Sequence, residues 1–236
     1  MKKRIALILT GTMLMGFVLS ACGDNESTEK KDEKTENSVE TSSNANNRTT
    51  FTVGFDAEYP PYGYMDENGE YTGFDLELAE AVCKLEGWEL VKKPINWDAK
   101  DMELNSGAID CIWNGFTMNG REDEYTFSIP YVDNSQVIVV AENSGINTPE
   151  DLAGKTVGVQ AASAALELLQ SDEKDGQKAL ADTFGALNEF ADYNTAFTEL
   201  QAGALDALAI DIGVANYQIK SRGEGYKILE ETLNTE

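Results

Sequence analysis

Two matching stretches organise this chain: Met102-Glu-Leu-Asn-Ser-Gly-Ala-Ile-Asp-Cys-Ile-Trp113 and Thr198-Glu-Leu-Gln-Ala-Gly-Ala-Leu-Asp-Ala-Leu-Ala209. Each has the pattern of a helix end, then a glycine that stops the helix, then a short apolar strand. A second pair, Thr52-Val-Gly-Phe-Asp56 and Thr156-Val-Gly-Val-Gln160, indicates an apolar strand at the start of each half. The repeat therefore predicts two α/β halves, each built as strand, helix, strand, helix, strand.

The sequence between the repeats predicts the remaining elements. Asp66-Glu-Asn-Gly69 is typical of a turn between two short strands. Asp75 is placed to cap a helix that runs to Gly87, and Ser163 is placed to open a helix over 164–169. The extended run 131–141 suits a strand that passes from one half to the other. Further strands are expected over 89–95, 155–160, 187–191, 205–210 and 226–229, with a short helix at Pro149.

The composition excludes several classes of function. The chain has 236 residues, with 42 Asp and Glu against 18 Lys and Arg, a formal net charge of -24 and no histidine. Without imidazole there is no Ser-His-Asp or Cys-His nucleophilic site, no histidine-ligated zinc and no histidine general base. A sequence pI near 4.2 argues against a nucleic-acid-binding face, which needs clustered Lys and Arg.

The first fifty residues are predicted to lie outside the fold. Residues 1–21 combine a cationic start with a short apolar run and indicate a signal peptide. That run ends in Leu19-Ser-Ala-Cys22, which resembles a bacterial lipobox. We therefore expect Cys22 to carry acyl chains such as palmitate, which anchor the protein on the outer face of the cytoplasmic membrane. The alternative is an ordinary signal peptide with an incidental cysteine. Residues 22–50 are almost entirely polar and predict a disordered tether.

Two cysteines remain, Cys83 on a predicted helix and Cys111 in a predicted strand. Export permits a disulfide between them, but their placement favours two buried thiols. Two lone cysteines without a histidine are a poor metal site, so we expect neither a metal nor a cofactor.

Polar and aromatic residues follow the ends of the predicted strands. In open parallel α/β sheets, ligands bind beyond the carboxyl ends of the strands. These residues are therefore the candidates for a cleft between the two halves: Asp56, Tyr59, Trp97, Asn114, Gly115, Thr117, Arg121, Gln160, Ser163 and Asp211.

Charge types within this set point to one kind of ligand. Arg121 and Arg222 are the two arginines after residue 50. A guanidinium binds a carboxylate through two parallel hydrogen bonds, which lysine cannot reproduce. Asp211 would complement an ammonium group, and Ser163 lies at a predicted helix N-terminus, which favours a negative group. Together they predict a site for the zwitterionic end of an α-amino acid.

Each candidate also has a purely structural interpretation. Arg121 begins Arg-Glu-Asp-Glu and would suit a surface ion pair. Asp56 and Asp211 would suit turns or helix caps, and Tyr59 and Trp97 would suit the rim of a core. The residue types alone leave both interpretations open.

Six further stretches occur in a consistent order from about Phe51 to the end of the chain. They are Val53-Gly-Phe-Asp-Ala-Glu-Tyr-Pro-Pro-Tyr62, Gly73-Phe-Asp-Leu-Glu-Leu-Ala-Glu-Ala-Val82, Trp113-Asn-Gly-Phe-Thr-Met-Asn-Gly-Arg121, Thr126-Phe-Ser-Ile-Pro-Tyr131, Asp151-Leu-Ala-Gly-Lys-Thr-Val-Gly-Val159 and Leu205-Asp-Ala-Leu-Ala-Ile-Asp211. Together they resemble the polar-amino-acid receptors of ABC importers, which are family 3 extracellular solute-binding proteins.

The resemblance implies a two-lobed, periplasmic-binding-protein-like α/β fold that closes around its ligand. Each lobe would contain a mostly parallel sheet flanked by helices, with hinge strands between lobe 1 over 51–135 and lobe 2 over 136–236. Members usually return to the first lobe after the second. Because this sequence stops at Glu236, we expect it to lack that return segment.

The resemblance also implies a role for each candidate. Arg121, the Thr117 region and Ser163 would hold the ligand carboxylate, and Asp211 would take the α-amino group. The ligand side chain would lie between Tyr59 and Trp97, with Asp56 at its far end. Two features depart from the family pattern: the turn 117–121 is one residue shorter, and alanines stand at 161, 162 and 164, where glycine or hydroxyl residues are common.

The expected function is therefore capture of a polar amino acid by a monomeric, lipid-anchored receptor, which delivers it to the permease of an ABC importer. Asp56 favours a basic or amide side chain, because two facing carboxylates repel each other. One alternative is a dehydratase-like enzyme on the same fold, with Asp56 or Glu58 as acid and base. Another is a ligand-sensing lipoprotein that is not coupled to transport.

Overall fold

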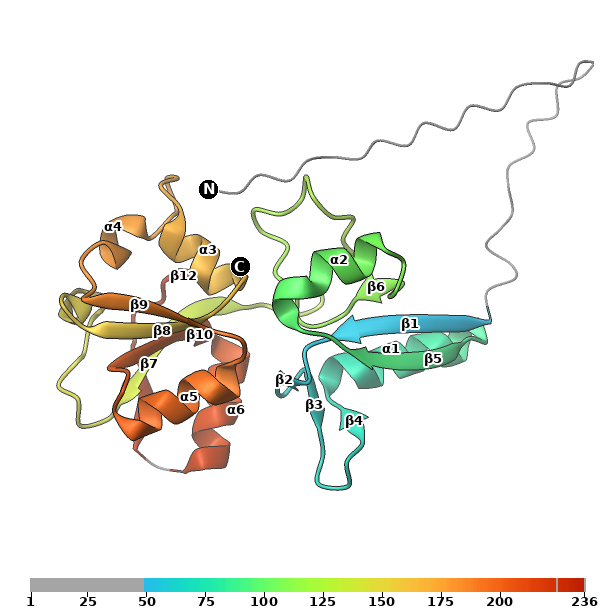
Figure 1. The fold of residues 1–236 in the computed structure, drawn as a ribbon, viewed down its shortest axis with the longest axis horizontal. Helices are drawn as coiled ribbons and strands as arrows, with labels where there is room; N and C mark the ends of the chain where they lie inside the picture. The colour runs from blue at the N-terminus through green and yellow to red at the C-terminus, as the bar shows by residue number, and fades with distance from the viewer. Residues whose placement is uncertain (1–48, 224, 236) are drawn as a thin grey trace, which may run out of the picture. The chain divides into compact units, whose positions relative to one another are not determined.

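The computed structural model describes residues 49–223 and 225–235. The predicted signal peptide, Cys22 and nearly all of the predicted tether lie outside these residues. Within them, we call the elements from β1 to β6 lobe 1 and the elements from β7 to β12 lobe 2 (Figure 1).

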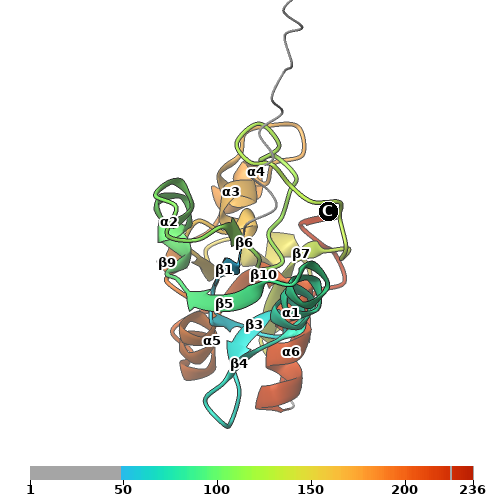
Figure 2. The same ribbon diagram turned by 90° about the vertical axis from the view of Figure 1, so that its right-hand side faces the viewer.

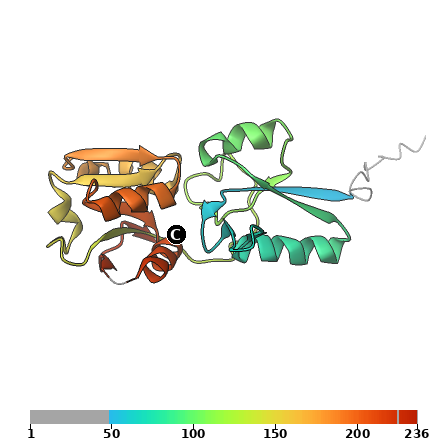
Figure 3. The same ribbon diagram turned by 60° about the horizontal axis from the view of Figure 1, so that its bottom comes forward.

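Lobe 1 contains a three-stranded parallel sheet in the order β5-β1-β6. Figure 3 shows its two helices on opposite sides of these strands. A small antiparallel sheet, β2-β3-β4, follows β1 and contains the predicted turn at 66–69. The elements are β1 (Thr50–Phe55), β2 (Glu58–Tyr59), β3 (Gly63–Met65), β4 (Tyr71–Thr72), α1 (Phe74–Glu86), β5 (Glu89–Pro94), η2 (Trp97–Ala99), α2 (Lys100–Asn105) and β6 (Cys111–Ile112).

Lobe 2 repeats this arrangement and extends it. Its parallel strands β9-β8-β10 correspond to β5-β1-β6, and the antiparallel strand β7 joins them to β11 and β12. The elements are β7 (Ser135–Ala141), η3 (Pro149–Leu152), β8 (Thr156–Gln160), α3 (Ala164–Gln170), α4 (Lys178–Ala181), β9 (Ala186–Phe190), α5 (Tyr193–Ala202), β10 (Ala207–Asp211), α6 (Ile212–Arg222), β11 (Tyr226–Ile228) and β12 (Asn234–Thr235). The strand, helix, strand, helix, strand order predicted for each half is confirmed.

The repeated residues make the same contacts in both lobes. The carboxylate of Asp110 accepts a hydrogen bond from the backbone N–H of Thr52 at 2.7 Å, and that of Asp206 accepts one from Thr156 at 2.8 Å. Each aspartate thus ties the strand after its glycine to the first strand of its lobe.

The glycine in the middle of each first strand is required for packing. A Cβ on Gly54 would lie 2.4 Å from Cδ1 of Ile109, and a Cβ on Gly158 would lie 2.5 Å from Cδ1 of Leu205. Ile109 and Leu205 occupy the same position of the repeat, so the same close approach explains both glycines.

The core of lobe 2 covers both faces of its sheet because the central strands β7 and β10 carry consecutive apolar residues, which face both sides. Val137 and Val139 pack with α5 and α6, whereas Ile138 and Val140 pack with α3. Figure 2 shows the helices of lobe 2 on both sides of β7 and β10. Lobe 1 has a smaller cluster in which Val53 and Phe55 of β1 pack on Leu76 and Ala79 of α1.

Two local predictions were wrong. Asp75 does not cap α1: Gly73, at φ 127°, is the N-cap residue, and Asp75 lies inside the first turn. Its buried carboxylate instead accepts a hydrogen bond from the Tyr131 hydroxyl at 2.9 Å. The predicted strand 131–141 begins later, at Ser135, where pairing with β12 starts.

The cysteines are not joined by a disulfide in the described part of the chain, as expected. Cys83 is buried, whereas Cys111 is half-buried rather than fully buried. Burial raises the pKa of the Cys83 thiol. Between residues 49 and 235, the described helices are all too short or too polar to cross a membrane.

Candidate functional site

The ends of the two repeated strands meet across the lobes. Asp56 follows β1 and Gln160 ends β8, so they hold the same position in the repeat. The Gln160 Nε2 amide donates to Oδ2 of Asp56 at 2.7 Å and to the Ala191 carbonyl at 3.1 Å. The other carboxylate oxygen of Asp56 accepts from the backbone N–H of Glu58 at 2.8 Å.

Burial dominates the electrostatics of Asp56. Desolvation raises its pKa from 3.8 to about 6, although the hydrogen bonds from Glu58 and Gln160 act in the opposite direction. Asn114 holds the same strand end, because its Oδ1 accepts from the Asp56 backbone N–H at 2.9 Å. Asp56 is therefore a fixed, buried carboxylate that is mostly ionised at neutral pH.

Asp211 is a second buried carboxylate, at the carboxyl end of β10. Its Oδ1 accepts hydrogen bonds from the amide of Asn134 and from the amide of Gln136, each at 2.8 Å. Asp211 also precedes α6, but its side chain does not cap that helix. The capping interpretation of Asp211 is therefore wrong.

Arg121 follows a tight turn in which its backbone N–H donates to the Met118 carbonyl at 3.0 Å. The guanidinium donates from Nη1 to the Thr117 carbonyl at 3.1 Å. It also donates to Oε1 of Glu167 in α3, from Nη2 at 2.7 Å and from Nε at 3.3 Å. Its Cζ lies 4.8 Å from the centroid of the Phe116 ring. Arg121 is a buried cation that joins the two lobes, not a surface one.

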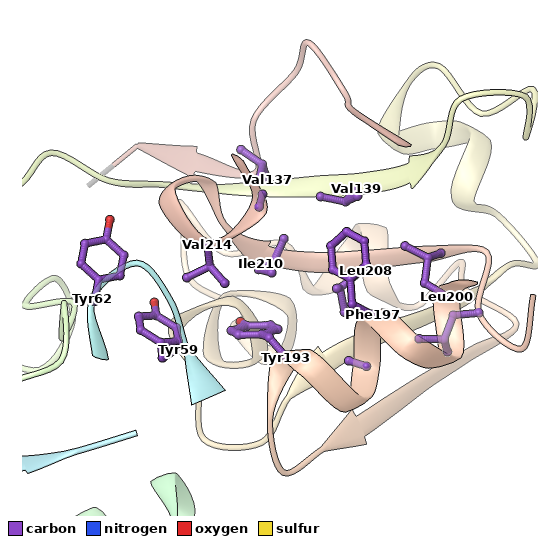
Figure 4. Close-up of a cluster of buried hydrophobic side chains, with 13 residues drawn as sticks. Tyr59, Tyr62, Val137, Val139, Tyr193, Phe197, Leu200, Leu208, Ile210 and Val214 are labelled. Carbon is purple, nitrogen blue, oxygen red and sulfur yellow. The ribbon is translucent and has the colours of Figure 1, made fainter. Parts of the chain in front are cut away.

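The two predicted aromatics are both buried, and they have different neighbours. Tyr59 stacks on Tyr62 with ring centroids 5.5 Å apart and lies 6.0 Å from Tyr193 of lobe 2. Figure 4 shows Tyr59 and Tyr62 beside the cluster formed by Val214, Ile210 and Tyr193. Burial, and then the nearby Asp211, raises the pKa of Tyr59 well above its usual value.

Trp97 lies in lobe 1 but contacts the loop before α3. Its indole Nε1 donates to the Ala162 carbonyl at 3.1 Å. Ala162 has φ 55°, in the left-handed region that favours glycine, and it is the one non-glycine residue with positive φ among those described. The alanine that departs from the family pattern is thus accommodated at a cost in strain.

Ser163 is the N-cap residue of α3, as predicted. Its Oγ accepts from the backbone N–H of Leu166 at 3.1 Å. The hydroxyl proton can still donate, since that bond uses the oxygen as an acceptor.

Nine of the ten candidates line one small cavity. Its volume is about 20 Å³, close to the space needed for one water molecule. Asp56 is the exception, since Gln160 lies against it. The lining residues are Tyr59, Trp97, Asn114, Gly115, Phe116, Thr117, Arg121, Gln160, Ser163, Ala164 and Asp211.

Four residues that were not predicted from the sequence contact the candidate residues. Asn134 and Gln136 bind Asp211, Glu167 binds Arg121, and Lys100 packs over Trp97 with its Nζ 5.3 Å from the ring centroid. Of these, only Gln136 could have been suspected from the sequence, because it is a lone amide at the start of an apolar strand. The other three become neighbours of the site through tertiary packing.

Larger cavities adjoin lobe 1. One of about 300 Å³ shares Tyr59 and the segment 115–117 with the small cavity and continues along 127–134. Another, of about 700 Å³, is lined largely by apolar residues such as Leu78, Val82 and Trp113. Across the described ranges, no cluster of three or more Cys, Asp or Glu could hold a metal ion.

Comparison with known proteins agrees with this architecture. Residues 51–211 match the family model described as bacterial extracellular solute-binding proteins, family 3. The L-cystine-binding protein TcyJ of Escherichia coli strain K12 is 30% identical over 190 residues, which cover 79% of this chain and 68% of that protein. The arginine-binding extracellular protein ArtP of Bacillus subtilis is 28% identical over 226 residues, covering 95% of this chain and 78% of the relative.

Solved structures show the same fold. A histidine-bound ABC uptake transporter substrate-binding protein from Streptococcus pneumoniae has a TM-score of 0.71 and 34% identity, covering 79% of this chain and 78% of that chain. An ancestral arginine-binding protein bound to arginine has a TM-score of 0.70 and 36% identity, with 79% and 81% coverage. The periplasmic-binding-protein-like fold expected from the sequence is confirmed, and the similar proteins bind amino acids rather than catalyse reactions.

Proposed function

The chain belongs to family 3 of the bacterial extracellular solute-binding proteins, and from that premise we propose that it captures a polar amino acid between its two lobes. The bound amino acid has a basic or amide side chain and is delivered to the permease of an ABC importer. The protein itself is a binding protein and not an enzyme.

The observation that carries this proposal is the convergence of opposite charges on one cavity. Arg121 and Asp211 both border it, one a buried cation and the other a buried carboxylate. A free amino acid carries the complementary pair, a carboxylate and an ammonium group on one carbon. Arg121 would bind the carboxylate, and Asp211 would accept from the ammonium group.

Binding requires the lobes to separate first. A cavity of about 20 Å³ is far below the roughly 300 Å³ or more of a small-molecule site. The polar contacts that must loosen include Gln160 with Asp56, Trp97 with Ala162, and Arg121 with Glu167. The packing of Tyr59 on Tyr193 must loosen as well. Release of Gln160 would expose Asp56 to the far end of the ligand, where a carboxylate favours a cationic or amide group.

Isothermal titration with the twenty amino acids and L-cystine tests the proposal. We expect binding in the micromolar range or tighter for at least one of them, and nothing tighter than millimolar would contradict it. Arg121→Lys should weaken every ligand by roughly 100-fold, because a bidentate charge pair is lost. Arg222→Lys is the matched control: Arg222 stacks on Phe197 in lobe 2, so affinity should be unchanged.

Asp56→Ala tests the side-chain assignment separately. It should reduce the preference for L-arginine over uncharged amino acids, whereas Arg121→Lys should weaken all ligands alike. Because the pKa of Asp56 is raised to about 6, the affinity for L-arginine should also fall as the pH drops from 7 to 5. Swapped effects of the two variants would overturn the role assignment.

Lipid anchoring is proposed from the sequence around Cys22. Cells that express the full chain should hold the protein in the membrane fraction, and Cys22→Ala should release it or leave an unprocessed precursor. Mass spectrometry of the mature N-terminal peptide should find acyl chains on Cys22. An unmodified N-terminus at another residue would favour an ordinary signal peptide.

A further inference from the structure

Arg121 has hydrogen-bonding capacity left after its protein contacts. A guanidinium carries five N–H groups. Within the described residues its side chain uses three of them: Nε and one N–H of Nη2 on Glu167, and one N–H of Nη1 on the Thr117 carbonyl. One N–H on each terminal nitrogen remains, and a carboxylate can accept a hydrogen bond from each of two such groups.

Glu167 holds Arg121 from beside the cavity and not from inside it. Arg121 lines the cavity, whereas Glu167 is not among the lining residues. The side chain of Arg121 is 5% exposed and that of Glu167 is 53% exposed. Glu167 therefore leaves the space inside the cavity to another group, and water screens its repulsion from a second carboxylate.

A second buried cation, Lys100, lies with Arg121 around Phe116. Lys100 is also buried, with its Nζ 5.9 Å from the Phe116 centroid, and it has no ion-pair partner among the described residues. Burial lowers the pKa of Lys100, while Asp101 and then Glu167 and Asp98 act in the opposite direction. Arg121 also lowers this pKa, so a further negative charge in the cavity would be favoured by both cations.

We propose that Glu167 is a positioning residue of the ligand site, which holds Arg121 from lobe 2 while the two remaining N–H groups of Arg121 bind the ligand carboxylate. This inference rests on the proposed function. One guanidinium then contacts both lobes and the ligand, so that closure of the lobes and retention of the ligand depend on the same side chain.

The variant Glu167→Gln tests the proposal, because it keeps the shape of the side chain and removes its charge. Stopped-flow measurements would use whichever of L-arginine, L-histidine and L-cystine binds the natural protein most tightly. We expect dissociation to become roughly tenfold faster, with little change in the association rate, because the loss is a contact of the closed state. Glu167→Asp should recover part of the effect.

Asp182→Asn is the matched control. It also removes one negative charge from lobe 2 and breaks an ion pair, with Lys178 at 2.5 Å, but that pair lies within one lobe. Its dissociation rate should equal that of the natural protein. An unchanged rate in Glu167→Gln, or tighter binding, would overturn the proposal; tighter binding would show that Glu167 competes with the ligand for Arg121.

A measurement without ligand separates this proposal from the proposed function. Trp97 is buried against lobe 2, so loosening of the lobes should shift the tryptophan emission of Glu167→Gln to longer wavelength, with no shift in Asp182→Asn. If the natural protein bound no amino acid but this shift occurred, the proposed function would fail while the interlobe role of Glu167 held. An absent shift would contradict that role whatever the ligand.

Discussion

The two lobes share one strand-end motif and differ in what surrounds it. In both, an aspartate from the repeat ties down the first strand, and a glycine in that strand lies under an aliphatic side chain. Lobe 2 buries both faces of its sheet in two clusters, whereas one small cluster fills lobe 1. The repeat thus sets the same strand contacts in both lobes. The helices that pack on those strands differ, and so does the size of the hydrophobic core.

The charges of the candidate site differ between the two copies of the repeat. The position after the repeated strand is an acid in lobe 1, Asp56, and an amide in lobe 2, Gln160, and they hydrogen bond across the lobes. Two copies of the acid would repel each other at this point. The shared residues of the repeat thus account for the geometry of the strand ends, and the residues that differ there account for the charges.

The largest expected effect concerns the buried acid Asp75 of lobe 1. Burial raises its pKa from 3.8 to about 6, so the folded state binds more protons than the unfolded state between pH 4 and 6. The contribution of Asp75 to stability therefore falls as the pH rises through this window, by up to about 3 kcal/mol. Asp75→Asn should remove this dependence.

Urea unfolding measured from pH 4 to pH 7.5 tests this pH dependence of the stability. The stability of Asp75→Asn relative to the natural protein should increase with pH and level off above about 6. The exposed Asp182→Asn reports the effect of removing a surface charge together with its ion pair to Lys178. A constant difference between Asp75→Asn and the natural protein would contradict the assigned cause.

The second largest expected effect is the loss of stability when Gly158 or Gly54 is replaced by alanine. Gly158→Ala should lose about 2 to 3 kcal/mol of unfolding free energy, because a Cβ there meets Leu205, Leu208 and Phe190. Gly54→Ala should lose about 1 to 2 kcal/mol, since its near contacts all belong to Ile109. Hydrogen exchange should place each loss in its own lobe. Equal losses would mean that the denser core of lobe 2 does not matter at this position.

The smallest expected effect is the loss of stability when one of the two aspartates of the repeat is replaced by alanine. Asp206→Ala should cost about 1 kcal/mol, and Asp110→Ala about half as much, because the bond to Thr156 is half-buried and the bond to Thr52 is exposed. Thermal unfolding of the single and double variants checks this. Because the residues lie in different lobes, their effects should add; a double variant that departs from the sum would show coupling between the lobes.

Much of this architecture was predictable from local patterns. The repeat predicted the strand order of both lobes, and Ser163 predicted the start of α3. Asp75 was misassigned because an aspartate before a helical pattern favours a cap, whereas tertiary packing placed this one against Tyr131. The start of β7 was misplaced because Tyr131 and Val132 favour an extended strand, but strand pairing begins at Ser135.

The candidate site also contains residues that the sequence predicted and residues that it did not. The rule that ligands bind beyond strand ends found nine residues of one cavity, because the chain itself fixes where each strand stops. Glu167 and Lys100 were missed because each lies on a helix at an ordinary position for a solvated charge. Their relation to Arg121 depends on contacts between segments far apart in the sequence.

The sequence by itself determined the family, the duplicated α/β frame and the set of residues at the strand ends, since these follow from periodicity, glycine placement and motif order. Only the tertiary structure decided which charges face one another. Arg121 meets Glu167, Asp56 meets Gln160, and Asp211 meets Asn134 and Gln136. The physical reason is that hydrogen bonds and ion pairs act over a few ångströms, and folding alone brings segments 46 to 104 residues apart within that range.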